Sequence, residues 1–227
     1  MPICNILKYD EPLTYDRGIA IQNQLAAARY SREIPDTLLI CEHTPTITLG
    51  RKAIETDLIS SLADLRKRGI EVVRSDRGGE ITYHAPGQVV VYPILNLEDH
   101  VKDLHFYLRE LEQTVMDILS KFDICGVRVP GLTGVWINDQ KIAAIGIKVS
   151  RWVTTHGFAL NVSTDVAPFR QDFVPCGIRD RGVTSMQEQL GDRTPTVGDV
   201  QKVASECFCR RFSLTGSISP PLGIIPT

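Results

Sequence analysis

A short glycine-rich loop at residues 77–88 constrains the fold and the chemistry of this chain more than any other segment. It reads Arg77-Gly-Gly-Glu-Ile-Thr-Tyr-His-Ala-Pro-Gly-Gln88 and lies between two strand-like runs. Gly78 and Gly79 allow the backbone to approach a ligand or to adopt positive φ, and Pro86-Gly87 is typical of a turn. Residues 82–84 alternate as a short strand does. The segment is therefore either a solvent-exposed connection or a loop that holds a ligand.

The composition narrows the class of protein. The chain has 227 residues, 43% of them hydrophobic and 23% charged, which fits one large domain or two small ones. A net charge of -2 and a pI near 6.2 provide no strong positive field, so we expect neither nucleic acid nor a membrane as a partner. The N-terminus lacks the pattern of a signal peptide, and no run of about 18 apolar residues occurs. We therefore expect a cytoplasmic protein.

The order of predicted elements indicates an α+β fold. Strands are expected at residues 3–8, 37–42, 46–49, 71–74, 89–97, 134–137, 141–149 and 157–162, and helices at 14–31, 57–68, 103–122 and 198–212. Asn138-Asp139 is a hairpin turn signal between two of the strands. We predict a mixed β-sheet flanked by helices, with residues 1–214 as a single domain and the Gly-, Ser- and Pro-containing residues 215–227 as a loosely held tail.

The cysteines predict reduced thiols and no metal site. Neither their spacing nor that of the histidines matches a zinc-ligand pattern. Cys4, Cys41 and Cys125 lie in apolar runs and are predicted to be small buried hydrophobes. Cys176 differs, because Pro175 and Gly177 place it on a bend. A thiol on a bend is either incidental or presented to a cleft.

A second informative stretch surrounds Lys141 at the start of a predicted strand. This lysine is either a solvated charge or a cation that points along the sheet into a cleft, where it would bind an anion. The small residues Ala143, Ala144 and Gly146 leave room beside it. In the next strand, His156-Gly157 interrupts an apolar run and could bring backbone donors to a carbonyl or a thioester.

Several motifs together carry a resemblance that covers nearly the whole chain. They are Arg77-Gly-Gly, Thr82-Tyr-His84, Pro86-Gly-Gln88, Lys141-Ile-Ala-Ala-Ile-Gly146, Thr155-His-Gly-Phe-Ala-Leu-Asn161, Pro175-Cys-Gly177 and Val183-Thr-Ser185. In this order and at this spacing, the chain resembles the octanoyltransferases of lipoate biosynthesis. The resemblance implies the fold of biotin and lipoate protein ligases. It also implies transfer of an octanoyl group from octanoyl-acyl carrier protein to a lysine on the lipoyl domains of 2-oxoacid dehydrogenases and on the glycine cleavage H protein.

The resemblance also assigns roles to residues. The family's acyl-thioester nucleophile falls on Cys176, and the lysine that lowers its pKa falls on Lys141. The substrate-binding positions fall on Arg77, Gly78, Gly79, Glu80, Ile81, Thr82, Tyr83, His84, Ala144, Ile145, Gly146, Gly157, Phe158 and Ala159. One departure is Ala85, where the family usually has glycine. Alanine there would cost about 1 to 2 kcal/mol if the position needs positive φ.

Acyl transfer from a thioester can be argued from the residue types alone. Free cysteine has a pKa of about 8.5, and a nearby ammonium such as that of Lys141 lowers it toward neutrality. Exchange between thioesters is close to isoenergetic, and amide formation in the second step is downhill, so neither ATP nor a cofactor is required. An eight-carbon chain needs an apolar slot, which Ala143, Ala144, Gly146 and Gly157 beside Ile145 and Phe158 would line.

Three other functions fit parts of the same pattern. An ATP-dependent lipoate or biotin ligase would use Lys141 to stabilise an acyl-adenylate, but the loop lacks the arginine- and glycine-rich adenylate loop of biotin ligases. A non-catalytic acyl-binding domain would not require both Cys176 and Lys141. A hydrolase would combine Cys176 with His84, and His84 is equally consistent with a purely structural histidine.

Overall fold

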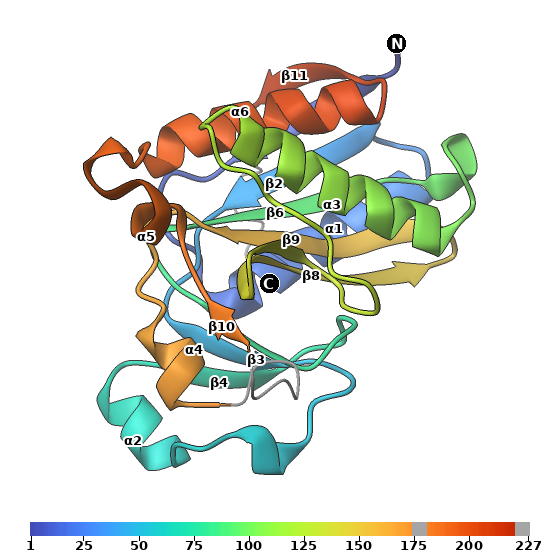
Figure 1. The fold of residues 1–227 in the computed structure, drawn as a ribbon. Helices are drawn as coiled ribbons and strands as arrows, with labels where there is room; N and C mark the ends of the chain where they lie inside the picture. The colour runs from blue at the N-terminus through green and yellow to red at the C-terminus, as the bar shows by residue number, and fades with distance from the viewer. Residues whose placement is uncertain (174–180, 221–227) are drawn as a thin grey trace.

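The computed structural model describes residues 1–173 and 181–220, and within them eight strands form one mixed sheet (Figure 1). The order is β10 (Gly182–Val183), β8 (Gln140–Ser150), β9 (Val153–Asn161), β6 (Gln88–Ile94), β2 (Asp36–Cys41), β1 (Ile3–Lys8) and β11 (Thr215–Ser219), with β7 (Val135–Ile137) paired to β8. The pairs at the two ends of the sheet are parallel. At one end β1 pairs with both β2 and β11, and at the other end β10 pairs with β8. The central pairs of β2, β6, β9 and β8 are antiparallel.

A second, smaller sheet lies at one end of the molecule, at the bottom of Figure 1. It consists of β4 (Glu71–Arg74), β3 (Thr46–Leu49) and β5 (Ile81–His84). The short helices α2 (Leu62–Lys67) and α4 (Ala167–Gln171) pack beside it. Ile47, Leu65, Tyr83 and Phe169 belong to its own apolar cluster. The predicted ligand loop therefore begins before β5 and ends at β6, so it connects the two sheets.

Helices cover both faces of the large sheet. α3 (Leu104–Ser120) and α6 (Val197–Arg211) lie side by side on one face, and α1 (Tyr15–Tyr30) lies on the other (Figure 1). The Asp103 carboxylate caps α3, and Thr196 with Asp199 forms a capping box on α6. A further short helix, α5 (Met186–Leu190), and the 3-10 turns Glu55–Asp57, Leu97–Asp99 and Gly191–Arg193 complete the described elements.

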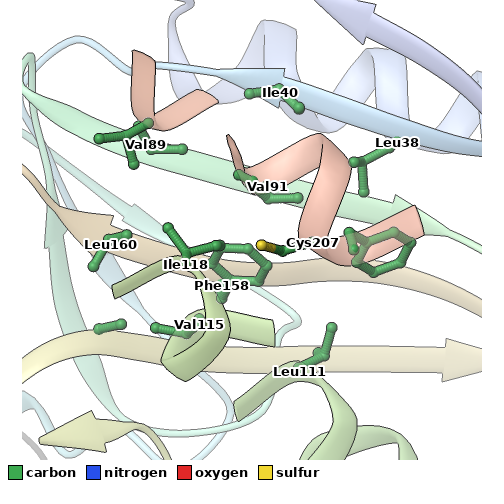
Figure 2. Packing of buried hydrophobic residues seen from close by; sticks show 14 of the residues in the cluster. Leu38, Ile40, Val89, Val91, Leu111, Val115, Ile118, Phe158, Leu160 and Cys207 are labelled. Carbon is green, nitrogen blue, oxygen red and sulfur yellow. The ribbon is translucent and has the colours of Figure 1, made fainter. Parts of the chain in front are cut away.

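The alternation of side chains along the central strands builds two separate apolar layers. On β2, Leu38 and Ile40 face α3 and α6, while Leu39 and Cys41 face α1. β6 and β9 alternate in the same way, as expected for a strand covered on both sides. Figure 2 shows the first layer, in which Leu111 and Val115 of α3 and Cys207 of α6 lie over the sheet.

The predicted α+β class is confirmed, and three local expectations are wrong. The helix expected at 57–68 begins only at Leu62, because the Ser61 hydroxyl caps it by accepting from the Asp64 N–H. Cys125 is exposed rather than buried. Residues 215–219 of the expected loose tail form β11, which pairs along its length with β1, and residues 221–227 lie outside the described part.

Candidate active site

A pocket of about 240 Å³ lies between the two sheets. Its lining takes residues from β5 of the small sheet, from β8 and β9 of the large sheet, and from the connecting loops. Of the predicted site residues that the structure describes, those that line it are Arg77, Gly79, Glu80, Ile81, Thr82, His84, Lys141, Ala144, Ile145, Gly146, Gly157, Phe158 and Ala159. Segments far apart in the sequence therefore meet in one cavity.

Two of the predicted segments pair directly across neighbouring strands. Ala144 lies opposite Ala159, Ile145 opposite Phe158, and Gly146 opposite Gly157 in the antiparallel register of β8 and β9. Small side chains on adjacent strands leave an apolar hollow in the sheet surface. A Cβ at Gly157 would lie 2.2 Å from the Val91 carbonyl oxygen, so this position requires glycine. Ala143, expected to line the slot, instead belongs to the core layer under α3 and α6. The side chains of Ile145 and of Phe158 (Figure 2), expected beside it, pack in the same layer.

Arg77 anchors the glycine-rich loop from within. Its side chain is buried, and its guanidinium donates to the Thr48 hydroxyl at 2.8 Å, to the Thr48 carbonyl at 2.8 Å and to the Glu80 carbonyl at 2.8 Å. The backbone adds further bonds between residues 77–80 and 50–52. The loop is thus held as one rigid unit against β3, which allows its residues to face the pocket without help from a ligand.

Two predicted binding residues do not line the pocket, and one predicted strain is absent. The Gly78 N–H donates to the Ile147 carbonyl at 2.9 Å and docks the loop onto β8. Tyr83 points into the small-sheet cluster, where its ring meets Phe169 at a centroid distance of 5.7 Å. Ala85 is buried and has no positive φ; Gly87 has φ +86 instead, so the alanine imposes no backbone strain.

Lys141 lies at the start of β8, and its side chain extends to the pocket. The residue is only 9% exposed, and its Nζ lies 4.9 Å from the centroid of the Trp136 ring. A second cation approaches the same ring, with Arg181 Cζ 5.5 Å from the centroid. Both contacts favour a positive charge beside the indole face. Lys141 also pairs with Val183 of β10, a short stretch of chain after Cys176. Cys176 itself lies outside the described residues.

The deep wall of the pocket contains an aromatic and histidine cluster, of which the sequence assigned only His84 to substrate binding. Its pocket-lining members are Tyr15, His84, Tyr92 and His156, and His43 lies behind them. His43 Nε2 is 2.7 Å from the Tyr92 hydroxyl, and its Nδ1 is 3.0 Å from the Leu13 carbonyl. Burial lowers the pKa of His43 to about 4 and that of His84 well below its ordinary value. These imidazoles are therefore neutral at neutral pH.

His84 and His156 differ in their partners. His84 Nδ1 is 2.7 Å from Gln88 Oε1, while its buried Nε2 has no hydrogen-bond partner among the described residues. His156 Nε2 is 2.8 Å from Asp76 Oδ1, and Lys148 contacts the other oxygen of that carboxylate. Burial lowers the pKa of His156, although Asp76 opposes the shift. His156 also has φ +58 within β9, a conformation that is uncommon for residues other than glycine.

Several further lining residues were missed at the level of sequence. They are Tyr15, Lys52, Gln88, Val90, Tyr92, Gly131, Leu132, Thr133, Asn161, Phe169 and Val183. His156 also lines the pocket, whereas the sequence singled it out only for backbone donors next to Gly157. Gln88 and Asn161 close two of the quoted motifs, and the Gln88 amide donates to Asn161 Oδ1 at 2.8 Å. The last residues of these motifs could therefore have been predicted as pocket-lining residues. Tyr15 lies in a helix and Leu132 in a loop, and neither has a motif around it, so no sequence signal pointed to these two.

Comparison with known proteins places this arrangement in a family. Residues 14–209 match the model of the lipoyl protein ligase A/B catalytic domain. An octanoyltransferase of Chloroflexus aggregans is 48% identical over 205 residues, which are 89% of this chain and 92% of that protein. The chain belongs to the lipoyl protein ligase A/B catalytic domain family, as the motifs predicted.

Solved structures confirm the fold at low sequence identity. A putative lipoate protein ligase of Thermoplasma acidophilum with bound lipoic acid has a TM-score of 0.74 at 14% identity, covering 97% of this chain and 90% of that one. A biotin protein ligase of Aquifex aeolicus has a TM-score of 0.56 at 15% identity, covering 92% and 70%. Within residues 1–173 and 181–220, no helix is long and apolar enough to cross a bilayer.

Proposed function

We propose that this chain transfers an octanoyl group from octanoyl-acyl carrier protein to a lysine of a lipoyl domain, through a thioester on Cys176. Membership of the family and the 48% identity to an octanoyltransferase support octanoyl transfer in protein lipoylation. The observation that carries the proposal is the position of Lys141, a buried cation at the edge of a pocket whose floor is formed by Ala144, Gly146, Gly157 and Ala159. That combination suits an apolar acyl chain next to an anionic sulfur.

In the first half-reaction the Cys176 thiolate attacks the carbonyl carbon of the octanoyl thioester. A new carbon–sulfur bond forms, the carbonyl oxygen carries the negative charge of the tetrahedral intermediate, and backbone N–H groups stabilise it. Collapse of the intermediate breaks the bond to the carrier's sulfur, which takes a proton from the Lys141 ammonium and leaves as a thiol, so that Lys141 becomes neutral. The Lys141 ammonium stabilises the attacking thiolate by attraction of opposite charges. Each unit by which it lowers the pKa of the Cys176 thiol corresponds to about 1.4 kcal/mol.

In the second half-reaction the lysine amine of the acceptor attacks the octanoyl-enzyme thioester. The amine must lose a proton to form the amide, and Lys141, once neutral, accepts it directly or through water. Cys176 leaves as the thiolate, so the enzyme returns to its starting state. The two half-reactions consume no ATP and use no cofactor or metal.

The donor, acceptors and compartment belong to the same proposal. We assign octanoyl-acyl carrier protein as the donor, and the lipoyl domains of 2-oxoacid dehydrogenases and the glycine cleavage H protein as the acceptors, with the cytoplasm as the site of reaction. Within the pocket, each CH2 of the acyl chain that is buried contributes roughly 0.8 kcal/mol. The apolar floor between β8 and β9 therefore favours binding of the acylated carrier over binding of the carrier with a free thiol.

The proposal is tested by intact mass spectrometry of the protein mixed with octanoyl-acyl carrier protein, next to C176S and K141A. We expect one octanoyl adduct on the wild type that hydroxylamine removes, none on C176S, and slow formation on K141A. Adding a lipoyl domain should discharge the adduct in the absence of ATP. Transfer that requires ATP and free octanoate would instead identify a ligase. A thioester adduct on C176S, cleaved by neutral hydroxylamine, would place the acyl group on a residue other than Cys176.

A further inference from the structure

Glu112 is a buried carboxylate outside the pocket that no step of the proposed reaction uses. It lies on α3, and its side chain is 1% exposed. Its Oε2 accepts from Arg109 Nη1 at 2.6 Å and from Arg128 Nε at 3.0 Å, and its Oε1 accepts from the Gly134 N–H at 3.2 Å. A buried carboxylate is unfavourable unless its oxygens are satisfied, so these three contacts fix the positions of the donors.

Two of the three donors lie at the two ends of one loop, residues 128–134. Arg128 also donates from Nη2 to the Arg109 carbonyl at 2.8 Å and to Gln113 Oε1 at 3.1 Å. Its guanidinium is therefore held by three groups of α3. Between the two ends, Gly131, Leu132 and Thr133 line the pocket. A single helix thus holds both ends of a loop that forms one wall of the site.

The Gly134 end of this loop lies against the side chain of Lys141. A Cβ at Gly134 would be 3.4 Å from Lys141 Cε and 3.5 Å from Lys141 Cδ, and 2.7 Å from the Ala143 carbonyl oxygen. Gly134 has φ +123, a conformation suited to glycine. The backbone therefore approaches the lysine side chain closely, and a shift of Gly134 would change the space in which the ammonium is confined.

We propose that Glu112 and Arg128 are positioning residues for the acyl-transfer reaction, because they hold loop 128–134 against Lys141. This inference rests on the proposed role of Lys141 and adds residues that touch neither substrate nor reacting atoms. With the loop fixed, the Lys141 ammonium stays where it stabilises a thiolate. If the loop is released, the Lys141 side chain gains conformations that place its ammonium away from the thiolate. The thiolate is then less stable.

The test uses R128M, which keeps an apolar stem and removes the guanidinium, together with E112Q. The matched control is R109Q, because Arg109 contacts the same carboxylate but is 54% exposed and lies outside the loop. We measure kcat and KM for octanoyl-acyl carrier protein, and the pH dependence of iodoacetamide alkylation of the peptide that contains Cys176. R128M and E112Q should lower kcat by about 10- to 100-fold and raise the thiol pKa by about one unit, toward that of K141A.

R109Q should stay within about twofold of the wild type in both measurements. The inference is overturned if folded R128M keeps wild-type kcat and thiol pKa, if its activity falls with an unchanged thiol pKa, or if R109Q loses as much as R128M. Should E112Q not fold, R128M decides, because the Arg128 side chain is already 33% exposed. K141A and C176S test the proposed function separately: if they lose activity while R128M does not, only the positioning role fails.

Discussion

The ammonium of Lys141 lies 4.9 Å from the centroid of the Trp136 ring, and the indole is itself 2% exposed. The two residues face each other across the hairpin of β7 and β8, where they are also paired in register. A buried indole face stabilises a positive charge by about 0.5 to 2 kcal/mol. The hairpin therefore places the Lys141 side chain against a ring face that attracts a positive charge. In the proposed function, that charge stabilises the Cys176 thiolate.

Replacement of Trp136 should weaken this support in a graded way. We expect W136L to slow formation of the octanoyl-enzyme by roughly 5- to 30-fold, because a loss of about 1 to 2 kcal/mol of cation–π energy destabilises the ammonium, and W136F to lie between it and the wild type. Single-turnover kinetics with octanoyl-acyl carrier protein measure the effect.

The chain contains a matched control for this substitution. Lys102 Nζ lies 5.3 Å from the ring centroid of Trp152, which is not among the pocket-lining residues. W152L removes a comparable contact and should leave the single-turnover rate within about twofold. Equal losses in W136L and W152L would show that the effect is one of general stability.

Substitution of Gly157 should disrupt the floor of the pocket. In G157A the new Cβ would meet the Val91 carbonyl oxygen at 2.2 Å, a contact that forces β9 away from β6. We expect a loss of about 2 to 3 kcal/mol in the free energy of unfolding, measured by urea denaturation.

The control for the glycine prediction is G198A in α6. A Cβ there comes no closer than 3.8 Å to a neighbouring group, and alanine favours helix. We expect this variant to gain about 0.5 to 1 kcal/mol. A G157A protein as stable as the wild type would contradict the close approach of the two strands.

Arg77 should be irreplaceable by lysine. The guanidinium uses all three of its nitrogens. Nη2 donates to the Thr48 hydroxyl and carbonyl and to the Glu80 carbonyl, Nε donates to the Thr48 hydroxyl at 3.2 Å, and Nη1 donates to the Gly78 carbonyl at 3.1 Å. The single nitrogen of a lysine ammonium cannot occupy all three donor positions. We expect R77K to lose about 2 kcal/mol of stability and to raise KM for the octanoyl donor by about tenfold, because the loop would no longer face the pocket in one conformation. R51K, at an exposed position of the adjoining turn, should change neither quantity.

The fold and half of the site were accessible from sequence because they depend on local patterns. Strand alternation and the helical spacing of apolar residues predict elements from residues close in sequence. The motif loop and the segment 144–146 carry their own signature of small and polar residues. The pairing of Ala144 with Ala159 and the inward turn of Ala143 depend instead on strand register, which no single segment specifies.

The parts that escaped prediction are those made by tertiary contact. Tyr15 belongs to the deep wall only because α1 packs on the sheet face opposite α3. Glu112 looked like an ordinary polar position of an amphipathic helix, and its partners Arg128 and Gly134 are brought to it by the turn that follows. Burial of a polar residue is decided by its neighbours in space, so the sequence pattern of α3 could not reveal it.

The neutral histidines of the deep wall make stability depend on pH below neutrality. Burial lowers the pKa of His43 from its ordinary 6.5 to about 4, so the unfolded chain binds this proton before the folded one does. The contribution of the neutral imidazole to stability is therefore complete above pH 6.5 and is lost as the pH falls toward 4, at about 1.4 kcal/mol per pH unit and about 3 kcal/mol in all. Urea denaturation between pH 7 and 4.5 should show this decline in the free energy of unfolding. In H43Q the decline should be smaller by the contribution of His43, although this variant is less stable than the wild type at pH 7. An unchanged slope in H43Q would mean that His43 does not titrate on unfolding, and that its neutral, buried state in the folded protein is assigned wrongly.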